Sequence, residues 1–247
     1  MSDMPLLAHL LELRTRILRA LIAVGLVLIV MAYFAKDLYH NLALPLLSKM
    51  PAGTSMIATD VASPFFVPFK LALVLSFFVA MPAVLYQVWA FVAPGLYKHE
   101  RRLIAPLLAM SSLLFYGGIA FAYFVVFPVI FTFFTSVAPQ GVTIATDISS
   151  YLDFVLKLFF AFGVAFEIPI AVTLLCYTGA VEVQTLAKKR PYIIVIAFAL
   201  GMLLTPPDVI SQTLLAVPMW LLFELGLVMA RMVKRRRAPE DEEEEAQ

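Results

Sequence analysis

The residues of this chain that could do chemistry are glutamates in unusual surroundings. Glu100 lies in a short basic stretch with Lys98, and Glu12 lies among arginines that include Arg16. Each carboxylate is either a local counter-ion or an acceptor for a cationic guest. An exposed local pair, such as Glu12 with Arg16 four residues later, contributes well under about 1 kcal/mol. A guest with two guanidinium groups would offer each carboxylate a bidentate partner with stronger hydrogen bonds. The residues alone leave both alternatives open.

Glu167 differs because it lies between two apolar runs, 158–166 and 168–176. An ionisable group inside a membrane is unfavourable by roughly 3 kcal/mol even on the insertion scale. Pro169 frees a backbone carbonyl and can bend the helix, which would open room for a guest. Glu167 is therefore either a structural hydrogen-bonding group for a neighbouring helix or a site for a polar partner or for protons.

Motifs of the common enzyme classes are missing from the sequence. It contains no glycine-rich phosphate loop, no HExxH and no GxSxG. His9, His40 and His99 are too scattered for a metal site, and Cys176 has no second cysteine. We expect no enzymatic activity, no metal and no cofactor, so any work must draw on a partner or an ion gradient.

The elements that position these carboxylates are predicted to be membrane-spanning helices. Hydrophobic residues make up 62% of the 247-residue chain and charged residues 14%, whereas a soluble protein carries about 25% charged residues. The uncharged runs at 71–97 and 103–146 exceed the length of about 20 residues that a spanning helix requires. Because the apolar residues are continuous and do not alternate, we predict an all-α integral membrane protein rather than a barrel.

We expect six spans, the last two of them short, at approximately 17–34, 69–92, 104–131, 151–179, 192–205 and 209–230. An amphipathic helix precedes the first span. Of the 18 lysines and arginines, 14 fall on the side of the two chain ends, which predicts that both termini are cytoplasmic. Residues 36–68, with a short helix near 37–47, and residues 132–150 then form the external connections. Residues 232–247 are expected to be a charged, disordered cytoplasmic tail.

Seven motifs occur in the order in which they occur in TatC, the multispanning subunit family of the twin-arginine protein translocase, which this chain resembles. They are HLLELR at 9–14, MIATDVASPFF at 56–66, YQVWAFVAPGLYKHERR at 86–102, AFAYFVVFP at 120–128, FGVAFEIP at 162–169, KKRPY at 188–192 and GMLLTPPD at 201–208. The resemblance implies a single membrane domain over residues 1–231, with six helices in a cup- or glove-like arrangement. It also implies that the protein is located in the bacterial cytoplasmic (inner) membrane.

The resemblance further implies a core receptor that recognises twin-arginine signal peptides and exports folded proteins with the proton-motive force. Glu12 and Glu100 would then receive the two arginines. The surface around these carboxylates would be shaped by Arg14, Phe91 and Lys98. No nucleic acid is expected among the partners.

Docking and translocation residues are also implied by the resemblance. Contacts with single-span partners similar to TatA and TatB would involve Glu167, Met202, Thr205 and Gln212. Pro45 and Asp208 match positions that the family needs for translocation. Self-association and contact with membrane lipid are expected as well.

Two other classes of function compete with this interpretation. A proton-coupled small-solute transporter could use Glu167 as its carrier, but such transporters usually contain an internal repeat, and the two halves of this chain show no convincing one. A purely structural scaffold would leave Glu12 and Glu100 without a purpose. The sequence therefore predicts a translocase receptor.

Overall fold

The computed structural model of this protein describes residues 4–47, 56–92, 104–137, 145–204 and 209–245. The elements within these ranges are all helices, and the only bridge between extended residues joins Ile57 to Asp147. The prediction of an all-α protein is thus confirmed. The chain divides into two compact units. Unit 1 is Met1–Leu113 with Phe127–Leu156, and unit 2 is Leu114–Val126 with Lys157–Gln247.

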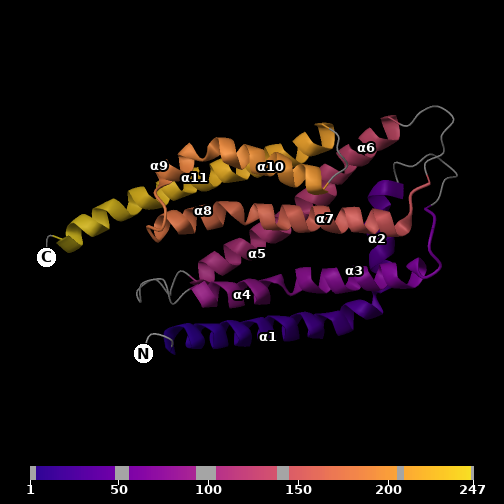
Figure 1. Ribbon diagram of the computed structural model, residues 1–247, viewed down its shortest axis with the longest axis horizontal. Helices are drawn as coiled ribbons and strands as arrows, with labels where there is room; N and C mark the ends of the chain where they lie inside the picture. The colour runs from indigo at the N-terminus through magenta and orange to yellow at the C-terminus, as the bar shows by residue number, and fades with distance from the viewer. Residues whose placement is uncertain (1–3, 48–55, 93–103, 138–144, 205–208, 246–247) are drawn as a thin grey trace. The chain divides into compact units, whose positions relative to one another are not determined.

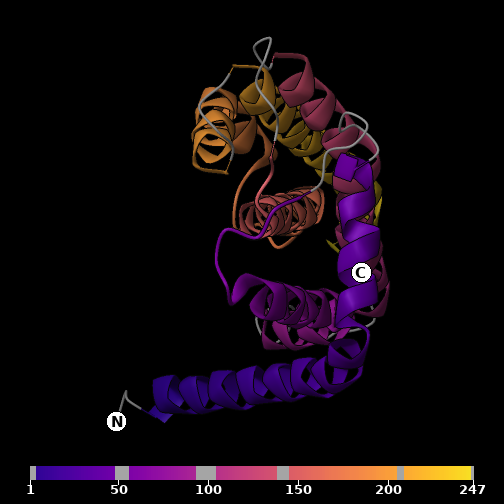
Figure 2. The ribbon, with the colours of Figure 1, turned by 90° about the vertical axis from the view of Figure 1, so that its right-hand side faces the viewer.

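Unit 1 is built around α1 (Met4–Tyr33), α3 (Ser63–Val79) and α4 (Met81–Val92). In Figure 1, α3 and α4 follow one another end to end, and α1 lies alongside both. α2 (Ala35–Leu47), the short helix predicted near 37–47, turns across the end of α1 (Figure 2) and packs against α3 and α6 (Phe127–Val137). The unit also contains the start of α5 (Ile104–Phe121) and of α7 (Ile148–Phe166). Tyr151 joins two of these helices, because its hydroxyl donates to the carbonyl of Leu42 at 2.8 Å.

Unit 2 is centred on α11 (Val209–Glu245), which packs along α8 (Ile168–Tyr177) and α10 (Arg190–Leu204) (Figure 1). α9 (Val183–Lys188) leads into α10, and the unit also includes the π-helical segment η3 (Ala122–Val126). Its core contains Val172, Phe223 and Leu227. The approach of α8 to α11 is close at Gly226, where an added Cβ would lie 2.9 Å from the Cα of Pro169.

Four helical stretches are long and apolar enough to cross a membrane: Leu10–Tyr33, Pro106–Val137, Ile148–Tyr177 and Val209–Val233. α3 and α4 pass together as a fifth candidate, bent by 49°. α10 has 15 residues, roughly 22 Å, and is shorter than the hydrocarbon core of about 30 Å. The protein is therefore a multi-pass membrane protein, while six spans, cytoplasmic termini and a single domain over 1–231 stay predictions.

Prolines account for the breaks within the long apolar segments. Pro82 follows the junction of α3 and α4, Pro128 follows η3, and Pro169 follows the junction of α7 and α8. A proline has no N–H to donate, so the carbonyl four residues earlier loses its partner and the helix shifts, bends or restarts. The sequence predicts the break near Pro169, but the bend before Pro82 and the π-helical turn were not predicted.

Two segment boundaries differ from our expectation. α3 begins at Ser63, six residues before the predicted span at 69, with Pro64 in the first turn, where proline is favourable. α11 is helical to Glu245, whereas the sequence predicts a disordered tail over 232–247. The lysines, arginines and glutamates of this tail are good helix formers, which accounts for the helical backbone.

Candidate functional site

Glu12 lies on α1 and already accepts a guanidinium group. Arg16, one helical turn later, donates from Nε at 3.0 Å and from Nη2 to the same oxygen, Oε1. The side chains of Glu12 and Arg16 are 36% and 19% exposed, so the carboxylate is the more accessible partner. Its second oxygen, Oε2, accepts no hydrogen bond from residues that the structure describes. This arrangement has the chemistry that arginine recognition requires, with a local arginine as the donor.

The other residues predicted for signal-peptide binding are only partly described. Arg14 is exposed on α1, and Phe91 is half-buried near the end of α4. Lys98 and Glu100 lie outside the described residues. The structure thus places Glu12 and Arg14 on one helix that packs along α4, and it does not test whether Glu100 joins them.

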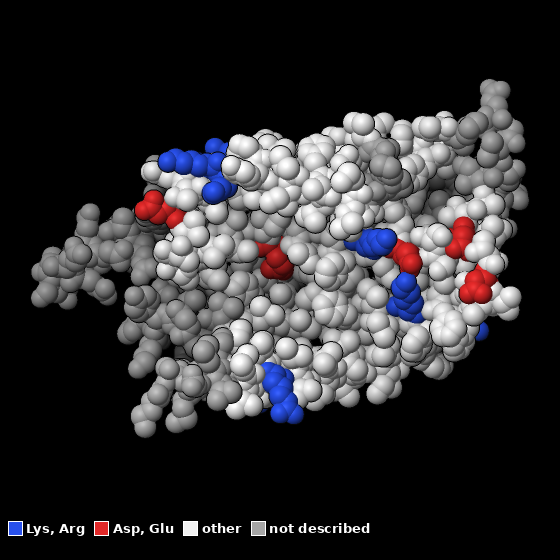
Figure 3. All heavy atoms as spheres, in the orientation of Figure 1, with Lys and Arg blue, Asp and Glu red and all other residues white. Residues whose placement is uncertain are grey.

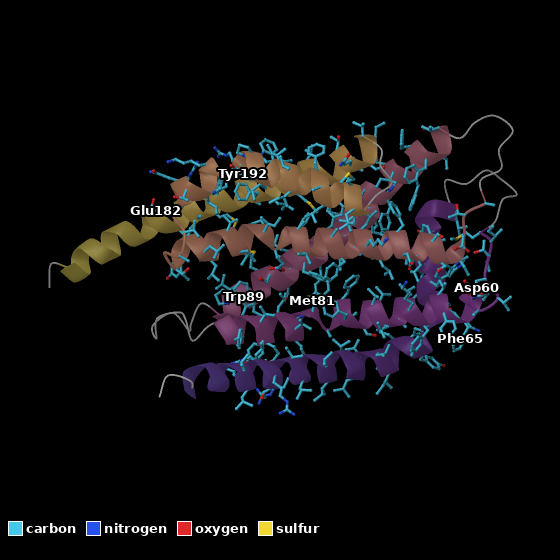
Figure 4. All side chains as sticks on the ribbon, viewed as in Figure 1. Asp60, Phe65, Met81, Trp89, Glu182 and Tyr192 are labelled. Atoms are coloured by element: carbon cyan, nitrogen blue, oxygen red, sulfur yellow. The ribbon has the colours of Figure 1, made fainter. Side chains whose placement is uncertain are left out.

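The end of α4 that carries Phe91 is attached to α5. The indole Nε1 of Trp89, labelled in Figure 4, donates to Oγ of Ser111 at 3.2 Å, and Ser111 is fully buried. A buried hydrogen bond of this kind contributes about 1 kcal/mol and fixes the direction of both helix ends. Trp89 therefore joins the end of α4 to α5, on either side of the basic stretch.

Three of the four residues predicted for partner docking, Glu167, Met202 and Gln212, lie in described parts of unit 2. Glu167 occupies the junction of α7 and α8, and its Oε1 atom is buried. Met202 on α10 is 61% exposed. Gln212 of α11 donates from Nε2 to the carbonyl of Phe198 at 2.8 Å and so joins α11 to α10. Thr205 and Asp208 lie outside the described residues, as does the side chain of Pro45 in α2.

A second guanidinium–carboxylate pair was missed by sequence reasoning. Arg190, at the start of α10, donates from Nε to Oε1 of Glu224 at 2.5 Å and from Nη2 to Oε2 at 2.8 Å. The sequence feature that could have predicted this pair is Glu224 itself, which interrupts an apolar run, where an acid requires a partner. On the face drawn in Figure 3, lysine and arginine side chains gather over this end of α9 and α10, and Lys189 lies 5.3 Å from the ring centre of Tyr192.

Asp147, just before α7, was also missed, and it holds the segment before α3. Its carboxylate accepts hydrogen bonds from the backbone and hydroxyl of Ser150 and from those of Thr59, at 2.9–3.1 Å. These bonds, that of the Ser150 backbone first, lower the pKa of Asp147 to about 2. Because the folded pKa is depressed, this stabilisation is present above the ordinary pKa of aspartate and is lost as the pH falls through about 2.

Comparisons with known proteins agree along the chain. A family model described as Sec-independent protein translocase protein (TatC) matches residues 8–218. TatC of Haemophilus influenzae is 60% identical and covers 98% of this chain and 93% of its own length. TatC of Escherichia coli K12 is 59% identical, with 92% and 88% covered. A crystal structure of the twin arginine translocase receptor TatC superposes with a TM-score of 0.82 at 38% identity, covering 92% of this chain and 99% of that one. The chain therefore belongs to the TatC family of Sec-independent protein translocase proteins.

Proposed function

We propose that this chain is the core receptor subunit of a twin-arginine protein translocase, which binds twin-arginine signal peptides and exports folded proteins with the proton-motive force. Membership of the family makes the chain a translocase component. The observation that supports the receptor role is the carboxylate of Glu12, which is partly exposed and already accepts a guanidinium group. We propose no enzymatic activity for the chain.

An incoming arginine can replace Arg16 with little loss. Both side chains carry the same planar donors, so exchange leaves the Glu12 carboxylate satisfied. An ion pair between residues i and i+4 on a helix surface contributes only about 0.3–0.5 kcal/mol, which a stronger external contact exceeds. Glu12 therefore serves as an acceptor that is kept occupied until a peptide arrives.

Glu100 takes the second arginine in this proposal. Once one arginine of the peptide is bound, binding of its neighbour is intramolecular and proceeds at a high effective concentration. Arg14, Phe91 and Lys98 shape the surrounding surface. Two carboxylates that act together account for a requirement for paired arginines rather than for one.

Unit 2 carries the proposed contacts with single-span partners similar to TatA and TatB. Glu167 would meet polar groups of a partner helix, because its carboxylate reaches the junction of two helices within an apolar stretch. Met202 offers an exposed apolar side chain nearby in sequence to Thr205, and Gln212 lies on the facing helix. No observation on the described residues favours the alternative of a proton-coupled transporter.

The remaining parts of the proposal concern location and assembly. The protein would lie in the bacterial cytoplasmic membrane with both termini in the cytoplasm, as the distribution of lysines and arginines indicates. Pro45 and Asp208 would support translocation on the external side. Association with further copies of the chain would complete the translocase.

The receptor role is tested by photo-crosslinking a twin-arginine signal peptide to the full chain in membrane vesicles that contain the single-span partners. Glu100→Gln should reduce crosslinking about tenfold or more, because a charge-assisted hydrogen bond contributes about 1.5–3 kcal/mol. Glu167→Ala, as the matched control, should keep the crosslinks and recruit fewer partner chains. A twin-lysine peptide measures the background. Undiminished crosslinking to an inserted Glu100→Gln variant would refute the proposal.

A further inference from the structure

The start of α3 has a buried face and an exposed face, and the exposed face is apolar. The buried face repeats every four residues, at Ser63, Val67 and Leu71. The opposite face is exposed and also repeats every four residues, at Val61, Phe65, Phe69 and Leu73. A helix whose outer face meets water carries polar residues there, whereas a helix that is apolar all round belongs to a core or a membrane. The exposed face of α3 therefore requires an apolar environment.

The turn that leads into α3 is held firmly, with its apolar residue pointing outward. Thr59 is bound by Asp147 through both its backbone N–H and its hydroxyl, and Ile57 exchanges backbone hydrogen bonds with Thr146 and Ile148 at 3.0 and 2.9 Å. Val61 is nevertheless 99% exposed. These bonds fix the turn at Ile57 and Thr59, and Val61 lies just beyond them.

The length of the helix pair indicates where this turn lies. α3 has 17 residues and α4 has 12, bent by 49° at Ala80. At 1.5 Å per residue, the pair extends roughly 39 Å along the axis of α3. The hydrocarbon core is about 30 Å thick, and the bilayer with its headgroup layers is about 40–45 Å thick. The pair thus reaches through the core into the headgroup layer at each end.

The pair of Lys70 with Asp153 agrees with this depth. Lys70 Nζ lies 2.5 Å from Oδ1 of Asp153, and Lys70 comes seven residues after Ser63, which is roughly 10 Å further along the helix. Because the helix pair exceeds the hydrocarbon core by about 4–5 Å at each end, Lys70 and Asp153 lie roughly 6 Å inside the hydrocarbon. Charges at such a depth are expected to pair with each other.

We propose that Val61, Phe65 and Phe66 are embedded in the headgroup layer of the phospholipid bilayer, and that Asp60 marks the boundary with water (Figure 4). The occupant of this face is lipid because its apolar residues continue from Val61 through Phe69 to Leu73 along the helix pair that crosses the membrane. The exposed Lys70 beside them is paired with Asp153.

This inference moves the membrane boundary from residue 69, where the sequence places it, to residue 61. It anchors the outer end of α3 in the bilayer while Asp147 holds the preceding turn. The inference rests on the proposed function only for the topology that makes this the outer leaflet; the depth itself rests on the exposed residues and on the helix length.

The depth is measured with spin labels in the full chain, reconstituted without partners in phosphatidylethanolamine and phosphatidylglycerol vesicles. In a Cys176→Ala background, one cysteine at a time is introduced as Val61→Cys, Phe65→Cys or Phe69→Cys. Ala145→Cys, on an exposed external residue, is the matched water control. Collision of each label with oxygen, which concentrates in lipid, is compared with collision with a water-soluble nickel chelate.

The proposal expects the oxygen-to-nickel ratio to rise from Ala145 through Val61 and Phe65 to Phe69, with Phe65 several-fold above Ala145. Ratios at Val61 and Phe65 equal to that at Ala145 would place the turn in water and overturn the proposal. Low collision with both reagents would show that protein covers the face, which would overturn it as well. The ratios do not depend on which side of the membrane the turn faces, so a reversed topology would contradict the proposed function and leave the test of this proposal unchanged.

Discussion

Among the residues that the structure describes, two carboxylates hold a guanidinium group, and they hold it in different ways. Glu12 on α1 accepts both hydrogen bonds of Arg16 through a single oxygen, from a residue one turn away. Glu224 on α11 uses both oxygens to hold Arg190 of α10, 34 residues earlier in the chain. The first pair joins nothing beyond its own helix, whereas the second joins two helices. The difference indicates that Arg16 can be exchanged for a guest, while Arg190 belongs to the fold.

The helices that carry the two carboxylates also differ in how tightly they are packed. In the most apolar stretch of α1, no residue is buried inside the protein, whereas 39% of the residues in the most apolar stretch of α11 are buried. Gly25 on α1 has nothing within 4 Å of the place of an added Cβ, whereas Gly226 on α11 has Pro169 and Val172 at 2.9 Å. α1 is thus a lightly packed helix that carries an accessible acid, and α11 is a packed framework helix.

The largest expected effect comes from making the same substitution in both helices. Gly226→Ala should lower the free energy of unfolding by about 1–3 kcal/mol, because the new methyl group overlaps α8. Gly25→Ala should leave it unchanged or raise it by up to about 1 kcal/mol, because alanine is the better helix former. Thermal unfolding in one detergent measures both. Equal effects would break the contrast between the two helices.

A smaller effect should separate the two acids. Glu224→Gln is expected to lower the unfolding temperature by a few degrees, because it leaves Arg190 without its charged partner between two helices. Glu12→Gln should change the temperature much less, since an exposed pair within one helix contributes little. Both substitutions remove one negative charge and keep the side-chain shape, so each controls for the other. A larger loss for Glu12→Gln would reverse the comparison.

The smallest expected effect concerns displacement of Arg16. Arg16→Gln should tighten binding of a twin-arginine peptide about twofold relative to Arg19→Gln, which removes the same charge from an exposed residue of α1 with no described ion pair. The factor follows from about 0.4 kcal/mol for a helical i, i+4 pair. Titration of a fluorescent peptide at equilibrium measures both variants. Identical affinities would show that Arg16 does not compete with the guest.

Residue spacing predicts one of the two pairs and not the other. Four residues on a helix bring Glu12 to Arg16, so the pair follows from local geometry alone. Arg190 and Glu224 meet only because α10 and α11 pack together, and no local pattern specifies that contact. The prolines likewise show in the sequence where a helix can break, but not how. Whether Pro82 gives a 49° bend and Pro128 a π-helical turn depends on neighbouring helices.

For the candidate site too, the sequence predicts some features and leaves others open. Composition and charge predict a helical membrane protein, and the order of the motifs indicates the family, which the comparisons confirm. The roles of Glu12 and Glu100 do not follow from residue types alone, because an exposed pair and a guest site contain the same residues. The proposed burial of the start of α3 in lipid does not follow from the sequence, since a span was expected to begin where the charged and proline-rich segment ends.

Whether Glu12 accepts an arginine of the signal peptide is tested by measuring the affinity of a twin-arginine peptide for Glu12→Gln and for Glu224→Gln. Both variants are purified in one detergent and titrated below their unfolding temperatures. The account predicts that Glu12→Gln weakens binding about tenfold or more, from the loss of a charge-assisted contact, and that Glu224→Gln binds within about twofold of the unaltered chain. Full affinity of Glu12→Gln, or an equal loss in both variants, would contradict the assignment of Glu12 as the acceptor.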